Sequence, residues 1–123
     1  MTILWVALGG AIGSAFRYLT VLAAMRLFGT GFPWGTAIVN VLGSFAMGIL
    51  AVILLEKAGN ARFLPFLLPG VLGGFTTFSA FSLDTVRLVE NGQTVSAVYY
   101  VAGSVALSVA ALMIGMGIAR SLA

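Results

Sequence analysis

Long apolar stretches alternate with short polar or glycine-rich breaks along almost the whole chain. There are four such stretches, at about residues 3–28, 33–55, 62–90 and 94–120. The breaks between them hold Gly29 and Gly31, the polar run 56–60, and Gly92. Each stretch exceeds the ~18 apolar residues that indicate a transmembrane helix. Hydropathy is continuous rather than alternating, which disfavours an outer-membrane β-barrel. The pattern predicts an all-α integral membrane protein, a single four-helix domain over residues 1–123.

Composition excludes a soluble domain. Of the 123 residues, 61% are hydrophobic and only 7% are charged, and the mean hydropathy is +1.15. Soluble domains carry about 25% charged residues. The net charge of +3 is spread over the expected helix ends, which indicates membrane topology and not a nucleic-acid-binding surface.

The side chains needed for most enzyme chemistry are missing. The chain has no Cys and no His, so thiolate nucleophiles, zinc sites and His acid–base catalysis are excluded. The three acids, Glu56, Asp84 and Glu90, stand apart in the sequence, so a paired-carboxylate active site is not expected. No ATP-binding motif is visible. We expect no enzyme activity.

The basic residues near the helix ends give almost no orientation bias. Lys57, Arg62 and Arg120 lie on the side of the termini, and Arg26 and Arg87 lie on the other side, a count of three against two. Because the Lys/Arg bias sets the orientation of a membrane protein, this chain is expected to insert both ways. Two copies of opposite orientation would then form an antiparallel homodimer.

Arg17 is a charged residue inside the first apolar stretch, and an intramembrane charge is a functional hypothesis by default. At 1.5 Å per residue, Arg17 lies roughly 17 Å and Asp84 roughly 10 Å from the same side of the bilayer. Two interpretations remain open. Arg17 either pairs with Asp84 or snorkels to the interface as a structural residue, or it draws an anion into a vestibule.

Small and polar residues form stripes on the first two stretches. The second carries Thr36, Asn40, Ser44 and Gly48 at steps of four, which share one helix face. Such stripes usually pack helices together, but the Asn40 amide also offers two donors to an anion. The first stretch has a similar face, which we interpret as a packing surface, made of Gly9, Gly10, Gly13 and Ser14.

The third stretch contains the most irregular sequence, GVLGGFTTFSAFS at residues 70–82. Two glycines followed by two threonines predict a helix that breaks near residues 73–77 and restarts with Thr76 or Thr77 as its cap. Irregular backbone at this depth is tolerated only inside protein or beside water. Freed carbonyls at Gly73 and Thr76 could bind a cation. The alternative is a kinked helix whose backbone groups are all satisfied again.

Aromatic rings and hydroxyls follow the break. Phe78 and Phe81 share a helix face, and the electropositive edge of a phenyl ring can contact an anion, although such a pair is usually a core feature. On the fourth stretch, Tyr100, Ser104 and Ser108 form a ladder of hydroxyls at steps of four. Hydroxyls can donate to an anion without a fixed charge that would trap it.

Together these segments resemble the Fluc (CrcB) family of small bacterial fluoride channels. The resemblance covers nearly the whole chain. It is carried by GSAFRY at residues 13–18, GTAIVNVLGSF at 35–45, and GGFTTFSAFS at 73–82.

The resemblance implies a passive fluoride channel in the inner (plasma) membrane. It implies an antiparallel dual-topology homodimer with two pores, and a structural, untransported sodium ion held on the two-fold axis by the Gly73 and Thr76 carbonyls. Phe78 and Phe81 would form the phenyl box of the pore, and Asn40 would donate to fluoride. By the same resemblance the polar track on the fourth helix is Tyr100, Ser104 and Ser108.

Two positions depart from the family pattern. Ala80 stands where Thr is common, which removes a hydroxyl, and Asp84 stands where Glu is common, which shortens its reach toward Arg17. The rival function is a small four-helix proton-coupled multidrug exporter. That mechanism needs a carboxylate deep in the first helix, which has none. A subunit that merely packs in the bilayer is a third possibility, disfavoured by the donor stripes.

Overall fold

Every secondary-structure element in the part of the chain described by the computed structural model, residues 1–56 and 61–122, is helical. In chain order the elements are α1 (Thr2–Phe28), α2 (Trp34–Ala51), the π-helix η1 (Val52–Glu56), the 3₁₀-helix η2 (Ala61–Phe63), the π-helix η3 (Phe66–Leu72), α3 (Gly73–Phe75), α4 (Ser79–Glu90) and α5 (Thr94–Ser121).

Four helical spans within the described residues are long and apolar enough to cross a membrane. They are Thr2–Phe28, Trp34–Glu56, Phe66–Glu90 and Thr94–Ser121. The prediction of an all-α membrane protein with four transmembrane helices is therefore confirmed. The polar run expected at 56–60 lies outside the described residues except for Glu56, and so does Lys57 of the basic count.

Glycines end two of these spans. Gly29 has a φ of +80°, and its N–H donates to the Met25 carbonyl at 2.9 Å. Gly92 has a φ of +78°, and its N–H donates to the Val89 carbonyl at 3.0 Å. Because this left-handed conformation disfavours residues with a Cβ, glycine allows the chain to turn directly at each helix end.

The third span is assembled from several short elements. Pro69 lies inside η3. Since proline has no N–H, it removes one bond of the helical ladder, and a π-helical turn is one way in which a helix accommodates such a defect. The element that follows, α3, is only three residues long.

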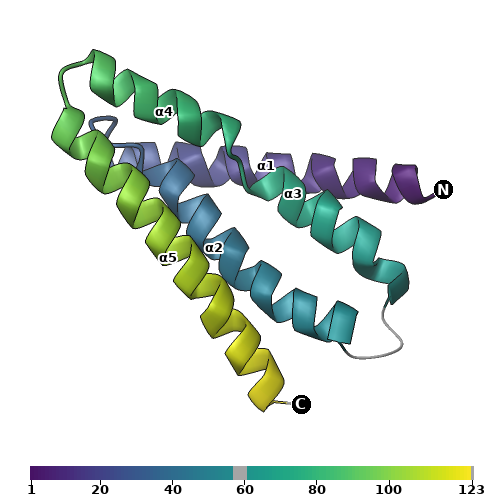
Figure 1. The fold of residues 1–123 in the computed structure, drawn as a ribbon. Coiled ribbons are helices and arrows are strands. Elements are labelled where there is room, and N and C mark those ends of the chain that lie inside the picture. The colour runs from purple at the N-terminus through teal and green to yellow at the C-terminus, as the bar shows by residue number, and fades with distance from the viewer. Residues whose placement is uncertain (57–60, 123) are drawn as a thin grey trace.

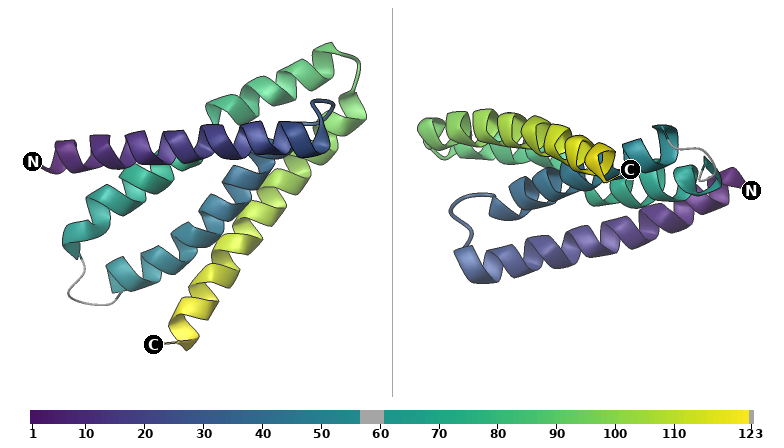
Figure 2. Two further views of the ribbon diagram at one scale, coloured as in Figure 1. Left: turned by 180° about the vertical axis from the view of Figure 1, so that it is seen from behind. Right: turned by 90° about the horizontal axis from the view of Figure 1, so that it is seen from below.

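The helices form two packed groups (Figure 1). One group places α5 alongside α2, and the other places α1 across η3 and α3. Further along the chain, α4 packs on α5. The start of α1 and the end of α5 lie on the side away from the loops at 29–33 and 91–93 (Figure 2).

Close backbone approach explains how α1 packs. A Cβ at Gly13 would overlap the Val71 carbonyl and lie 2.8 Å from the Phe75 nitrogen, and a Cβ at Gly9 would overlap the Phe66 carbonyl. The packing role predicted for the small-residue face of the first helix is confirmed at Gly9 and Gly13, where only glycine leaves room for these contacts, whereas a Cβ at Gly10 would meet no atom within 4 Å.

Larger side chains fill two small cores. One is formed by Phe81, Leu88, Ala97 and Tyr100, between α4 and α5. The other is formed by Leu54, Leu68 and Leu72, between η1 and η3. The first core positions the aromatic residues of the site described next.

Candidate functional site

The site is centred on the segment between α3 and α4. α3 ends at Phe75, Thr76 has extended backbone (φ −86°, ψ 158°), and α4 begins at Ser79. The Thr76 N–H and the Thr76 hydroxyl both donate to the Leu72 carbonyl, at 3.0 and 2.9 Å. The backbone and the side chain of Thr76 therefore both bond to a carbonyl of the preceding helical turn.

Asn40 on α2 binds the backbone of this segment with both ends of its amide. Its Oδ1 accepts a hydrogen bond from the Thr77 N–H at 2.8 Å, and its Nδ2 donates to the Thr77 carbonyl at 2.9 Å. The polar stripe of the second helix thus contacts the irregular part of the third span.

Thr77 also prepares the start of α4. Its Oγ1 accepts a hydrogen bond from the Ala80 N–H at 3.2 Å. A Thr hydroxyl that accepts from an N–H three residues later satisfies a backbone donor in the first turn of a helix. Neither of the two threonines predicted as caps occupies the N-cap position, which is Phe78. Thr77 satisfies the Ala80 N–H from one residue earlier, and Thr76 bonds back to α3.

Arg17 contacts the same segment from α1. Its Nε donates to the Gly74 carbonyl at 3.1 Å, and the residue is half-buried. The ion pair between Arg17 and Asp84, one of the interpretations that the sequence left open, does not form within the described residues. The two residues lie in different parts of the fold, because α1 packs on η3 and α3 whereas α4 packs on α5.

Asp84 instead pairs with α5. The Tyr100 hydroxyl donates to Asp84 Oδ2 at 3.0 Å. Tyr100 is only 1% exposed, and its ring lies 5.0 Å from that of Phe81, centroid to centroid. The ring of Phe32, from the loop before α2, is perpendicular to the Tyr100 ring, with 5.5 Å between the centroids. Sequence reasoning missed Phe32 because loop aromatics show no periodicity.

A groove of about 600 Å³ runs beside the break. It collects five of the six residues predicted for an anion pathway, namely Asn40, Phe78, Phe81, Ser104 and Ser108. Gly73 and Thr76 also line it. The sixth, Tyr100, is not among the lining residues and lies behind Phe81.

The two phenylalanines of the groove differ in exposure. Their ring centroids are 5.7 Å apart, with a tilt of 43° between the rings. Phe78 is 77% exposed, whereas Phe81 is 9% exposed. Phe81 is therefore fixed by the core, while Phe78 projects from the surface of the single chain.

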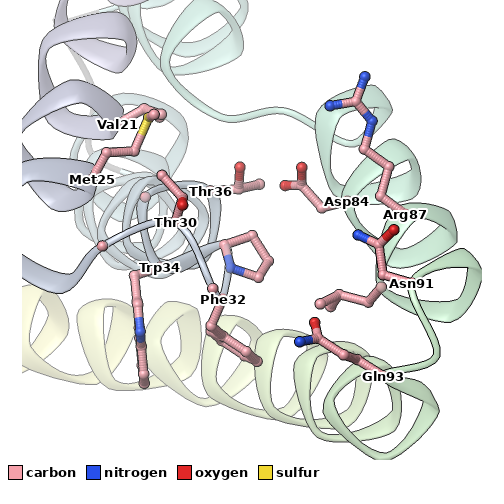
Figure 3. A pocket seen from close by; sticks show the side chains of 15 residues that line it. Val21, Met25, Thr30, Phe32, Trp34, Thr36, Asp84, Arg87, Asn91 and Gln93 are labelled. Atoms are coloured by element: carbon pink, nitrogen blue, oxygen red, sulfur yellow. The ribbon is translucent and has the colours of Figure 1, made fainter.

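A second pocket of about 440 Å³ lies at the loop end of the molecule (Figure 3). Figure 3 shows the side chains of Thr36 and Asp84 pointing toward one another across it. Arg87, one turn beyond Asp84 on α4, also lines it. Sequence reasoning did not select Arg87, although the spacing of three from Asp84 places both residues on one helix face.

Residues 4–116 match the family described as "CrcB-like protein, Camphor Resistance (CrcB)". The chain belongs to the CrcB family. The match covers more than half of the chain, so the resemblance inferred from the three motifs is confirmed.

Relatives of this CrcB-family chain bear the name "Fluoride-specific ion channel FluC". The one from Cereibacter sphaeroides (strain ATCC 17029 / ATH 2.4.9) is 60% identical over 119 residues, which cover 97% of this chain and 94% of the relative. The one from Chelativorans sp. (strain BNC1) is 56% identical over 118 residues, covering 95% and 94%. The one from Paracoccus denitrificans (strain Pd 1222) is 54% identical over 121 residues, covering 98% and 96%.

These names settle the broad class of the CrcB-family chain. Its relatives are ion channels, not enzymes, which agrees with the absence of catalytic side chains noted in the sequence. Together with the four apolar spans, the family indicates a multi-pass membrane protein.

Proposed function

We propose that this protein is a fluoride-selective channel through which fluoride flows passively down its gradient. The observation that carries the proposal is the groove beside the break. Its lining combines the Asn40 amide, the Ser104 and Ser108 hydroxyls and two phenyl rings, and none of its lining residues is charged. The names of the relatives support fluoride as the ion.

This lining suits a small and strongly hydrated anion. Neutral amide and hydroxyl donors can replace water around an ion without a fixed charge that would retain it. The ring edges of Phe78 and Phe81 add weak positive potential. Because the lining residues hold no carboxylate that could exchange protons, the proton-coupled drug exporter is not favoured.

We propose that two copies of the chain, in opposite orientations, form a homodimer with two pores. Phe78 lines the groove and is 77% exposed in the single chain, so a second copy would enclose what one chain leaves open. The near balance of basic residues, three against two, fits dual insertion. We expect this dimer in the inner (plasma) membrane, where a four-helix protein can serve fluoride export.

A structural sodium ion is proposed at the break, on the dimer axis. The donors that a continuous helix would give to the Gly73 and Thr76 carbonyls are engaged elsewhere, the Thr77 N–H with Asn40 and the Ala80 N–H with Thr77 Oγ1. The residues therefore fit a cation. Two carbonyls from each chain would supply four oxygens without a carboxylate, which suits a monovalent ion better than a divalent one.

Bound sodium would stabilise the dimer by mass action, because it binds the assembled form. The test is to replace sodium by a bulky organic cation on both sides of liposomes, then to measure fluoride flux and dimer stability. If neither changes, and a high-resolution structure shows no density on the axis, there is no sodium site.

Anion efflux from liposomes tests the channel itself. Proteoliposomes loaded with potassium fluoride or potassium chloride receive a potassium ionophore, and an electrode records the released anion. We expect rapid fluoride release and little chloride release. Drug-coupled proton flux would instead support the exporter. If neither anion is released faster than from protein-free liposomes, the protein is a structural subunit and not a channel.

A further inference from the structure

The hydrogen bonds around the break follow a definite pattern. In a continuous helix, the N–H groups of residues 77 and 80 would donate to the carbonyls of residues 73 and 76. Here the Thr77 N–H donates to Asn40 Oδ1 at 2.8 Å, and the Ala80 N–H donates to Thr77 Oγ1 at 3.2 Å. Side chains thus replace the two helical acceptors, and the Gly73 and Thr76 carbonyls lose their helical donors.

Two carbonyls of the same segment receive side-chain donors from other helices. The Gly74 carbonyl accepts from Arg17 Nε of α1 at 3.1 Å, and the Thr77 carbonyl accepts from Asn40 Nδ2 of α2 at 2.9 Å. The chain is held on both sides of Thr76 by helices remote in sequence. These contacts determine which backbone carbonyls of the segment accept a hydrogen bond from a side chain and which do not.

We propose that Arg17 and Asn40 are positioning residues that hold residues 76–78 out of a continuous helix and keep the Gly73 and Thr76 carbonyls available to a cation. The inference rests on the proposed function, since it concerns the same cation. It assigns to Arg17 a role other than attracting an anion or pairing with Asp84.

The geometry favours this role for Arg17. Its Nε meets a carbonyl of α3, at the C-terminal end of the helical run that begins with η3. Helix C-termini carry partial negative charge, so a cation is stabilised there. A hydrogen bond from a charged donor is also about twice as strong as a neutral one. The half-buried guanidinium therefore anchors the end of α3 to α1.

Arg17→Gln and Arg17→Met form a matched pair for the test. Glutamine carries a nitrogen donor at the same number of bonds from the backbone as Arg Nε, but no charge. Methionine has similar length and no donor. Arg26→Gln, which removes a charge from an exposed position in the last turn of α1, is the control for lost charge.

Two quantities are measured on the full chain in liposomes. One is the amide hydrogen exchange of the peptide covering residues 73–82. The other is the sodium concentration that gives half of the maximal thermal stabilisation. We expect Arg17→Met and Asn40→Leu to raise both by about tenfold, the effect of one lost hydrogen bond to a charged or buried group. Arg17→Gln, which keeps a donor but not its charge, should fall between Arg17→Met and the wild type. Arg26→Gln should stay close to the wild type.

The result that would overturn the proposal is Arg17→Met with wild-type exchange and sodium response, or Arg17→Gln as impaired as Arg17→Met. If Arg17→Met fails to fold, Arg17→Gln is compared with Arg26→Gln, and equal exchange and sodium response in these two variants would overturn the proposal. Failure of the wild type to pass fluoride would refute the proposed function and leave the exchange result standing. A wild type without any sodium stabilisation would refute the cation part of this inference.

Discussion

Asn40 can act on the backbone and on an ion at the same time. An amide has one acceptor oxygen and two N–H donors. The contacts with Thr77 use the oxygen and one donor direction of Nδ2, and the residue also lines the groove. The chemistry of a single side chain thus connects the irregular segment with the proposed pathway.

Asn40→Asp should suppress fluoride passage. The carboxylate can still accept from the Thr77 N–H, but it cannot donate to the Thr77 carbonyl, and its charge repels an anion in low dielectric. Fluoride efflux from proteoliposomes is the measurement, with dimer content checked by size-exclusion chromatography. Undiminished flux through a correctly assembled dimer would remove Asn40 from the pathway.

Alanine variants of Phe78 and Phe81 should differ in their loss of stability although both affect fluoride transport. Phe81 is 9% exposed and Phe78 is 77% exposed. Phe81→Ala leaves a cavity in the α4–α5 core and should cost about 3 kcal/mol of the free energy of unfolding. Phe78→Ala leaves no cavity within the single chain, so its loss should come only from contacts across the proposed dimer and stay below that of Phe81→Ala.

Both alanine variants should slow fluoride flux, since both rings line the groove. The free energy of unfolding is measured by denaturing the purified protein in detergent, and the fluoride flux is measured by efflux from liposomes. Equal losses of stability, or normal flux in Phe78→Ala, would show that the two rings do not have the roles assigned to them here.

At the scale of the elements, backbone proximity decides how α1 meets the third span. A Cβ at Gly74 would lie 2.6 Å from the Gly10 carbonyl oxygen, so the two backbones nearly touch. This approach also brings Arg17 within reach of the Gly74 carbonyl. The lack of a side chain at Gly74, as at Gly13 on α1, is therefore a condition for the hydrogen bond that holds the end of α3.

Gly13→Ala and Gly10→Ala test this packing with the same chemical change. A Cβ at Gly13 would overlap the Val71 carbonyl, whereas a Cβ at Gly10 would meet no atom within 4 Å. We expect Gly13→Ala to lower the free energy of unfolding by roughly 1–3 kcal/mol, the usual cost of overpacking, and Gly10→Ala to be nearly neutral. Similar stabilities of the two variants, measured by detergent denaturation, would contradict the close approach.

At the scale of the whole molecule, the single chain leaves one side of its groove open. Phe78 and the backbone of Gly73 are exposed, although both line the groove. An irregular segment in a membrane must be covered by protein or water. A second copy of the chain is the partner that we propose for this face.

Dual topology predicts that one position is accessible from both sides of the membrane. The chain has no native Cys, so single cysteines can be labelled cleanly. Gly31→Cys lies in the loop between α1 and α2, where a Cβ has open space, and Leu122→Cys lies at the opposite end, at a residue that is 81% exposed.

A membrane-impermeant thiol reagent should label each cysteine to about half in intact cells and fully after permeabilisation. The half value follows from equal insertion in both orientations when the basic residues show little bias. Complete labelling of one site and none of the other in intact cells would establish a single orientation and exclude the antiparallel dimer.

The sequence by itself determined the four spans, the family and most residues of the groove. Hydropathy, glycine punctuation and the spacing of Asn40, Ser104 and Ser108 are properties of separate segments. A membrane helix satisfies its own backbone hydrogen bonds, so its existence and its polar face can be inferred without knowledge of its neighbours.

Only the tertiary structure decided which groups meet. Depth along the helices suggested Arg17 and Asp84 as partners, but Arg17 binds the Gly74 carbonyl and Asp84 binds Tyr100. The physical reason is that interhelical hydrogen bonds depend on which helices touch and on which backbone groups a break leaves unpaired. Glycines allow α1 to pack closely on α3, whereas α4 packs on α5. The sequence of each helix taken separately does not show which helices will be in contact.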